Sequence, residues 1–187
     1  MKSILVSGAI FAVMVCMACP SAFALDASSY ITNVERSGSW SVIELAFSKQ
    51  IIYRIGSDSI SEPSAHIVFD FAPLSNCKPT PADLILNFGF YDDVMNNGEL
   101  PFEYKLPSQK HVIELVHSAM SPKDSFAFFT FKSLTVKNML LSKDKGKLAV
   151  SVLPSGDGRV KKSNIYFDLD GFSLAYKKAR ELCRDNI

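Results

Sequence analysis

The sequence predicts a mainly β fold, an antiparallel β-sandwich of about nine strands with one C-terminal α-helix packed on the sheet. Three observations lead to this prediction. Short segments alternate apolar and polar residues, as strands with one buried face do. Clusters of Gly, Pro, Asn and Asp separate these segments at the close spacing of all-β domains. Only the end of the chain, from Phe172 onward, changes to a helical period.

The strands are predicted from period-two alternation. In segment 66–71 the side chains of Ile67, Phe69 and Phe71 share one face. Segment 126–131 is almost wholly apolar, which suits a strand in the middle of a sheet. The same pattern predicts strands at 40–47, 50–55, 66–71, 83–91, 111–117, 126–131, 148–152 and 165–169. Turn signals lie between them at 75–81, 92–98 and 121–124, and as hairpin tips at 143–146 and 155–158.

The C-terminal helix is predicted from the spacing of its apolar residues, which all fall on one face. Those residues are Phe172, Ala175, Tyr176, Ala179, Leu182 and Cys183. Asp170, which follows the last predicted strand, is the expected N-cap. Since Cys183 lies on the apolar face, we expect it to point toward the sheet.

A signal peptide is predicted at the N-terminus. After Lys2 an apolar stretch runs to Cys19, and Ala22 and Ala24 form the small-x-small pattern that signal peptidase accepts. We therefore expect cleavage after Ala24, a signal peptide at 1–24, one exported β-rich domain at 25–187, and a periplasmic or secreted location. The alternatives are an uncleaved membrane anchor and a lipid anchor on Cys16 or Cys19.

A disulfide between Cys77 and Cys183 is the expected crosslink. Removal of the signal peptide leaves these two cysteines, and a pair in an oxidising compartment usually bonds. The bond would hold the helix against the sheet. The alternative is two free buried thiols.

Composition and motifs point away from several classes of function. Lys and Arg number 20 against 19 Asp and Glu, and this near balance argues against a nucleic-acid binder. No nucleophile elbow or phosphate-binding glycine loop is present. His111 and His117, on either side of Glu114, would lie about 20 Å apart along a strand, too far to share a zinc ion. We therefore expect no enzyme activity, no cofactor and no metal.

The charges are unevenly distributed along the chain. Segment 132–162 holds eight Lys and Arg against two Asp. Such a basic segment predicts a patch for an acidic protein or an anionic glycan or lipid surface, and the alternative is a set of solvated hairpin tips. The candidate patch residues are Lys143, Lys145, Lys147, Arg159, Lys161 and Lys162. A second candidate is an exposed loop that contains Asp92, Asp93, Asn96 and Asn97.

The end of the chain resembles a known family. Residues 146–152 (GKLAVSV) and 165–176 (IYFDLDGFSLAY) resemble the closing strands and Gly-Phe-x-x-Ala helix of the invasion-associated locus B family of exported bacterial proteins. The resemblance implies an exported β-rich protein linked to host interaction. It supplies no catalytic residues to carry over.

These observations predict a non-enzymatic exported binding protein, associated with host interaction or virulence. The alternative is a periplasmic inhibitor or immunity protein that blocks a cell-envelope enzyme, with the loop at 92–98 as its inserting element.

Overall fold

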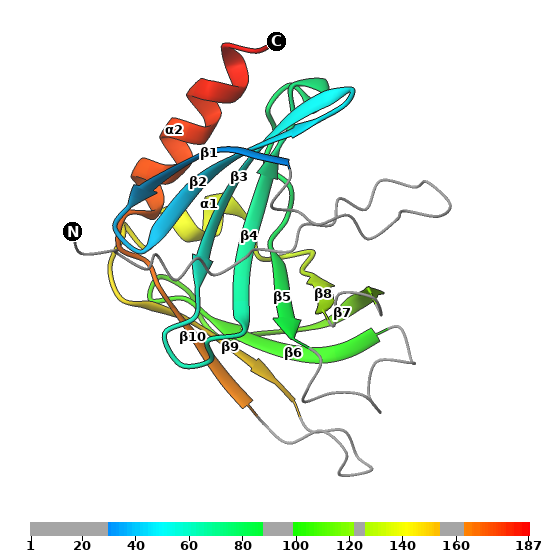
Figure 1. Ribbon diagram of the computed structural model, residues 1–187. Coiled ribbons are helices and arrows are strands. Elements are labelled where there is room, and N and C mark those ends of the chain that lie inside the picture. The colour runs from blue at the N-terminus through cyan, green and yellow to red at the C-terminus, as the bar shows by residue number, and fades with distance from the viewer. Residues whose placement is uncertain (1–29, 88–98, 122–125, 154–162) are drawn as a thin grey trace, which may run out of the picture.

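The computed structural model describes residues 30–87, 99–121, 126–153 and 163–187. Ten antiparallel strands form one sheet in the order β1-β2-β3-β4-β5-β8-β7-β6-β9-β10 (Figure 1). The strands are β1 (Ile31–Ser37), β2 (Trp40–Phe47), β3 (Gln50–Asp58), β4 (Ala65–Phe71), β5 (Asp83–Asn87), β6 (Glu99–Lys105), β7 (Val112–Ser121), β8 (Phe126–Thr130), β9 (Lys147–Val152) and β10 (Ser163–Asp168). The remaining elements are η2 (Pro73–Ser75), α1 (Val136–Leu140) and α2 (Phe172–Arg184). The predicted mainly β, antiparallel fold with a C-terminal helix is therefore confirmed.

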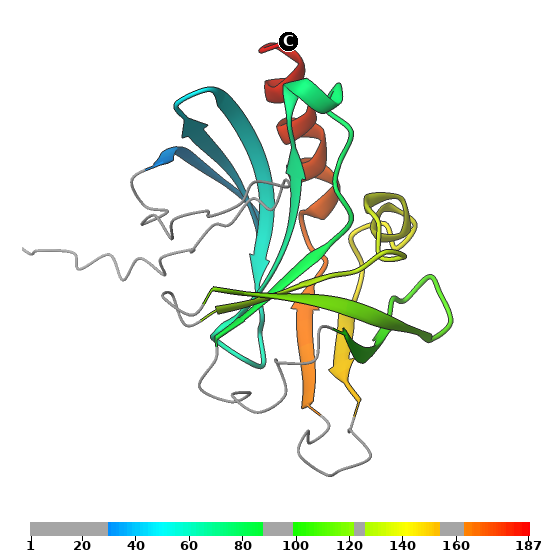
Figure 2. The same cartoon turned by 90° about the vertical axis from the view of Figure 1, so that its right-hand side faces the viewer.

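The two layers expected of a sandwich are parts of this one sheet, which bends strongly. In Figure 2, β3 and β4 run up the view, whereas β6 and β7 run across it below them. The bend brings β10 close to the connection between β3 and β4. There the backbone N–H of Ile60 donates to the carbonyl of Tyr166 over 2.8 Å, and the N–H of Tyr166 donates to Ser61 Oγ over 2.9 Å. These bonds satisfy polar groups along β10 that an uncovered edge strand would leave unpaired.

The main core lies on the inner face of the bent sheet and joins β2–β10 to both helices. The indole of Trp40 contacts the Phe172 ring edge-on with 4.8 Å between ring centroids, and Phe69 lies 5.7 Å from the same ring. Trp40 Nε1 also donates to the carbonyl of Asp168 over 2.9 Å, so its one polar group is satisfied. Helix α2 packs mainly against β2 and β3, and the Phe172 ring joins it to β2 and β4.

The predicted helix and crosslink are both confirmed. Phe172, Ala175, Ala179 and Cys183 are buried, in agreement with the predicted apolar face. Cys183 is bonded to Cys77, with 5.9 Å between their Cα atoms. The bond joins α2 to the segment that follows η2 and holds the helix on the sheet, as the position of Cys183 on the apolar face predicts.

The predicted N-cap of α2 is wrong, because Gly171 occupies that position with φ +83°. A glycine is needed there because residue 171 lies very close to the β1–β2 turn, which leaves no room for a side chain. A Cβ atom on Gly171 would lie 2.0 Å from the carbonyl oxygen of Ser37. The carbonyl of Asp170 instead accepts the N–H of Ser39 over 3.0 Å, which ties the turn to the start of the helix.

Two strands and one α-helix are absent from the predictions: β1, β6 and α1. Strand β1 has no fully buried residue, so its sequence carries no apolar alternation. Strand β6 does alternate, with Leu100, Phe102 and Tyr104 buried. This alternation is a signal by which the strand could have been predicted despite Pro101. Helix α1 is only five residues long, and it begins with a capping box in which Asn138 N–H donates to Thr135 Oγ1.

The prediction of a hairpin tip at 143–146 is wrong. This segment joins α1 to β9, and the strands before and after it in the sequence, β8 and β9, are not neighbours in the sheet. Strand β8 pairs with β5 and β7, whereas β9 pairs with β6 and β10. The predicted turns at 92–98 and 155–158 lie outside the described residues, although β9 and β10 pair as the second turn requires.

Candidate binding surface at the lysine end

Three of the predicted patch residues lie in the described part of the chain. Lys143, Lys145 and Lys147 are all exposed, on the turn between α1 and β9 and on the first residue of β9. The other three, Arg159, Lys161 and Lys162, lie outside the described residues. So do all four candidate loop residues, Asp92, Asp93, Asn96 and Asn97.

This turn does not stand alone, because the β6–β7 connection packs against it. The hydroxyl groups of Ser108 and Ser142 are 3.0 Å apart, at hydrogen-bond distance. Gly146 lies so close to Pro107 that a Cβ atom on the glycine would be 2.9 Å from Pro107 Cγ. Segments 106–111 and 141–147 therefore form one end of the molecule, although about thirty residues of sequence separate them.

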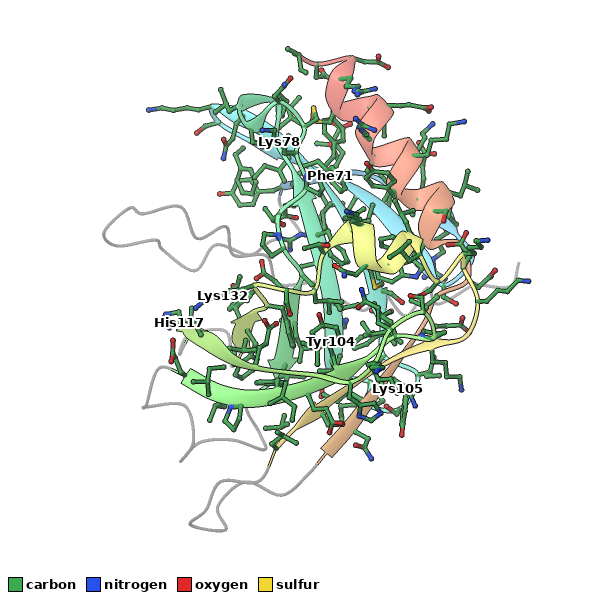
Figure 3. All side chains as sticks on the ribbon, turned by 180° about the vertical axis from the view of Figure 1, so that it is seen from behind. Phe71, Lys78, Tyr104, Lys105, His117 and Lys132 are labelled. Carbon is green, nitrogen blue, oxygen red and sulfur yellow. A yellow bond between two sulfur atoms is a disulfide. The ribbon has the colours of Figure 1, made fainter. Side chains whose placement is uncertain are left out.

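The contact adds two cations to the surface, Lys105 and Lys110, both exposed. Lys105 at the end of β6 lies opposite Ala149 of β9, so it shares a face with Lys147 two residues away and is its diagonal neighbour. Figure 3 shows Lys105 at the opposite end of the β6–β7 pair from His117. We call this surface the lysine end; it consists of Lys105, Lys110, Lys143, Lys145 and Lys147.

Two of the acidic side chains near this surface, Asp144 and Asp168, accept hydrogen bonds. Asp144 Oδ1 accepts the backbone N–H of Ser173 over 2.9 Å and its hydroxyl over 2.7 Å. Asp168 Oδ1 accepts the N–H of Asp170 over 3.0 Å, and Asp170 Oδ2 lies against Gly38. Asp144 and Asp168 are thus bonded toward the start of α2, whereas Asp170 is exposed beside the β1–β2 turn. The five exposed lysines outnumber these three carboxylates.

Asp144 also explains how α2 begins without a capping side chain of its own. Gly171 has no side chain that could accept from the first turn of the helix, and Asp144 accepts the N–H of Ser173, the second helical residue, from the α1–β9 turn. To reach Ser173 the turn places Lys143 and Asp144 at φ +52° and φ +57°, where Asp is tolerated better than most residues. Sequence reasoning could not have found this cap, because the two residues are distant along the chain.

Asp144→Ala is expected to lower the free energy of unfolding by about 1–2 kcal/mol, because it removes the cap and the favourable charge near the helix start. Urea denaturation of the variant beside wild type measures this loss. Asp144→Asn keeps an acceptor and tolerates the left-handed backbone, so about half the loss is expected. An alanine variant as stable as wild type would show that the cap contributes nothing.

A second polar cluster lies on the outer face of the sheet. Arg54 is 1% exposed and binds Asp70 through two contacts, Nε–Oδ1 at 2.6 Å and Nη2–Oδ2 at 2.7 Å. Asp83 accepts from Thr130 Oγ1 over 2.6 Å. Burial raises the pKa of Asp83 above that of an ordinary carboxyl, and the hydrogen bond from Thr130 opposes the rise. The paired geometry and deep burial of Arg54 indicate a structural ion pair.

The three histidines do not converge on one site. His66 Nδ1 lies 2.7 Å from Asp58 Oδ1, and His111 contacts Glu103. Glu114 instead accepts the backbone N–H of Ser133 over 3.1 Å, and His117 is exposed. Within the described residues no group of three or more His, Cys, Asp or Glu side chains is placed to hold a metal ion.

Comparisons with known proteins bear on the fold. No protein-family model matches the chain, and no curated protein matches it in sequence. A solved structure does match: the crystal structure of invasion associated protein B from Bartonella henselae, with a TM-score of 0.53 and 14% sequence identity. The match covers 82% of this chain and 99% of that one, so the likeness extends well beyond the C-terminal third. At this identity it shows a shared fold.

No helix in the described residues is long and apolar enough to cross a membrane.

Proposed function

We propose that this chain is an exported, non-enzymatic binding protein that holds an anionic partner at the lysine end, in a role linked to host interaction. The observation that carries the proposal is the assembly of exposed lysines from two distant segments on one surface, with the carboxylates of Asp144 and Asp168 held in hydrogen bonds. Such a surface attracts anionic partners and raises their local concentration.

Export is supported by two independent features. The N-terminal segment fits a signal peptide that is cleaved after Ala24. The disulfide between Cys77 and Cys183 suits the periplasm or the exterior, where such bonds persist.

The host-interaction role is supported by two resemblances. The fold is like that of a protein named for its association with invasion. Residues 146–152 and 165–176 also resemble the invasion-associated locus B family.

Charge reversal tests the proposed surface. Lys145→Glu/Lys147→Glu is expected to elute from a heparin column at a markedly lower salt concentration than wild type, because heparin is a polyanion and each lost cation weakens a salt-sensitive interaction. The control Lys49→Glu/Lys78→Glu makes the same change in net charge on exposed lysines elsewhere. Figure 3 shows Lys78 far from Lys105. Circular dichroism establishes that each variant is folded. Equal elution of the two variants would refute the lysine end as the binding surface.

A further inference from the structure

Two leucines are exposed beside the lysine end. Leu141 is 55% exposed where α1 ends, and Leu174 is 61% exposed in the first turn of α2. The bonds from Ser173 to Asp144 place the start of α2 against the turn that Leu141 leads into. The two leucines are thus brought to the same end of the molecule by the contact that caps the helix.

Further lysines accompany each leucine. Lys137 is exposed one helical turn before Leu141, and Lys143 follows two residues after it. Lys177 lies one turn after Leu174; its side chain is 74% exposed and its Nζ is 4.0 Å from Glu181 Oε1. The pattern is therefore exposed aliphatic side chains among ammonium groups.

We propose that the lysine end binds the surface of an anionic lipid bilayer, with Leu141 and Leu174 inserted at the boundary of headgroups and acyl chains. This inference rests on the proposed function and names the partner of the same surface. Peripheral proteins bind membranes through apolar side chains flanked by Lys and Arg, and anionic lipids attract the cations.

The residue types favour a bilayer over the other anionic partners. A polyanionic glycan would engage the lysines and leave the two leucines in water. An acidic protein would be expected to meet Arg and aromatic side chains, which are enriched at protein interfaces, whereas Lys is depleted there. A bilayer offers both negative charge to the lysines and hydrocarbon to the leucines.

Flotation with lipid vesicles tests the inference. The exported protein is mixed either with vesicles of phosphatidylcholine and phosphatidylglycerol or with vesicles of phosphatidylcholine alone, and the fraction that floats is measured. Wild type is expected to float with the anionic vesicles only. Leu141→Ser/Leu174→Ser should reduce the floating fraction about fivefold or more, while its elution from heparin stays that of wild type.

A matched control uses another exposed apolar pair. Val34 in β1 and Leu74 in η2 are 51% and 83% exposed and lie outside segments 105–111 and 141–147. Val34→Ser/Leu74→Ser should float like wild type. All variants share the same N-terminus, so the comparison isolates the substituted side chains.

Three results would overturn the bilayer inference: equal flotation of wild type with both vesicle types, unchanged flotation of the Leu141→Ser/Leu174→Ser variant, or loss of flotation in the control. If heparin retention still depends on Lys145 and Lys147 in any of these cases, the proposed anion-binding function stands and only the bilayer is excluded. If neither flotation nor heparin retention depends on those lysines, both proposals fail.

Discussion

Gly171→Ala will lower the free energy of unfolding by about 3 kcal/mol, because the alanine would combine backbone strain with a steric clash. Gly171 has φ +83°, where a side chain is unfavourable. Its new Cβ would lie 2.0 Å from the carbonyl oxygen of Ser37 and 2.5 Å from the carbonyl carbon. Both atoms belong to the backbone of the β1–β2 turn and cannot rotate away. Either the turn or the start of α2 must move. Chemical denaturation measures the loss.

Gly146→Ala is the matched control for this prediction. Its φ of +80° is nearly the same, but the added Cβ would meet a side-chain atom, Pro107 Cγ, at 2.9 Å. A side chain can shift more easily than backbone, so about 1–2 kcal/mol is expected. If both variants lose the same stability, the strained φ alone accounts for the effect, and the contact between α2 and the β1–β2 turn has no special role.

Cys183→Ser is expected to lower the melting temperature by about 6–12 °C under non-reducing conditions, which corresponds to about 3 kcal/mol. The disulfide joins residues separated by 106 positions. Without the bond the unfolded chain gains conformational freedom, and the chain-entropy model gives an upper limit of about 4–5 kcal/mol for such a loop. The substitution also places a hydroxyl at a position that is fully buried. Thermal unfolding followed by circular dichroism measures the change.

Cys77→Ser provides the comparison, because it breaks the same bond from the other side. The two serine variants should melt at similar temperatures, and reductant should lower the melting temperature of wild type toward theirs without changing the variants. A Cys183→Ser variant that melts with oxidised wild type would show that the helix is held by packing alone.

Much of the fold could be predicted from local patterns, since burial on one face repeats with the period of the element. Ile67, Phe69 and Phe71 alternate in sequence and all enter the core. The helical spacing from Phe172 to Cys183 also placed Cys183 on the buried face, and the count of two cysteines after residue 24 paired it with Cys77. These features depend on neighbours along the chain, which sequence shows directly.

The remaining features depend on contacts between distant segments. Asp144 caps a helix that begins 28 residues later, and its role follows from the left-handed turn that carries it. Lys105 and Lys110 join the lysine end only because the β6–β7 connection meets the α1–β9 turn. Charge density along the sequence identified Lys143, Lys145 and Lys147, since they lie within five residues of one another. It could not identify cations that strand pairing brings beside them.

Hydrogen exchange measured by mass spectrometry, with and without heparin, tests most directly whether the lysine end is the binding surface. Heparin is expected to slow exchange in segments 105–111 and 141–147, which meet at that end. Segments 31–37 and 50–58 should exchange at unchanged rates. Protection confined to 31–37 and 50–58, with none at 105–111 or 141–147, would show that heparin binds elsewhere.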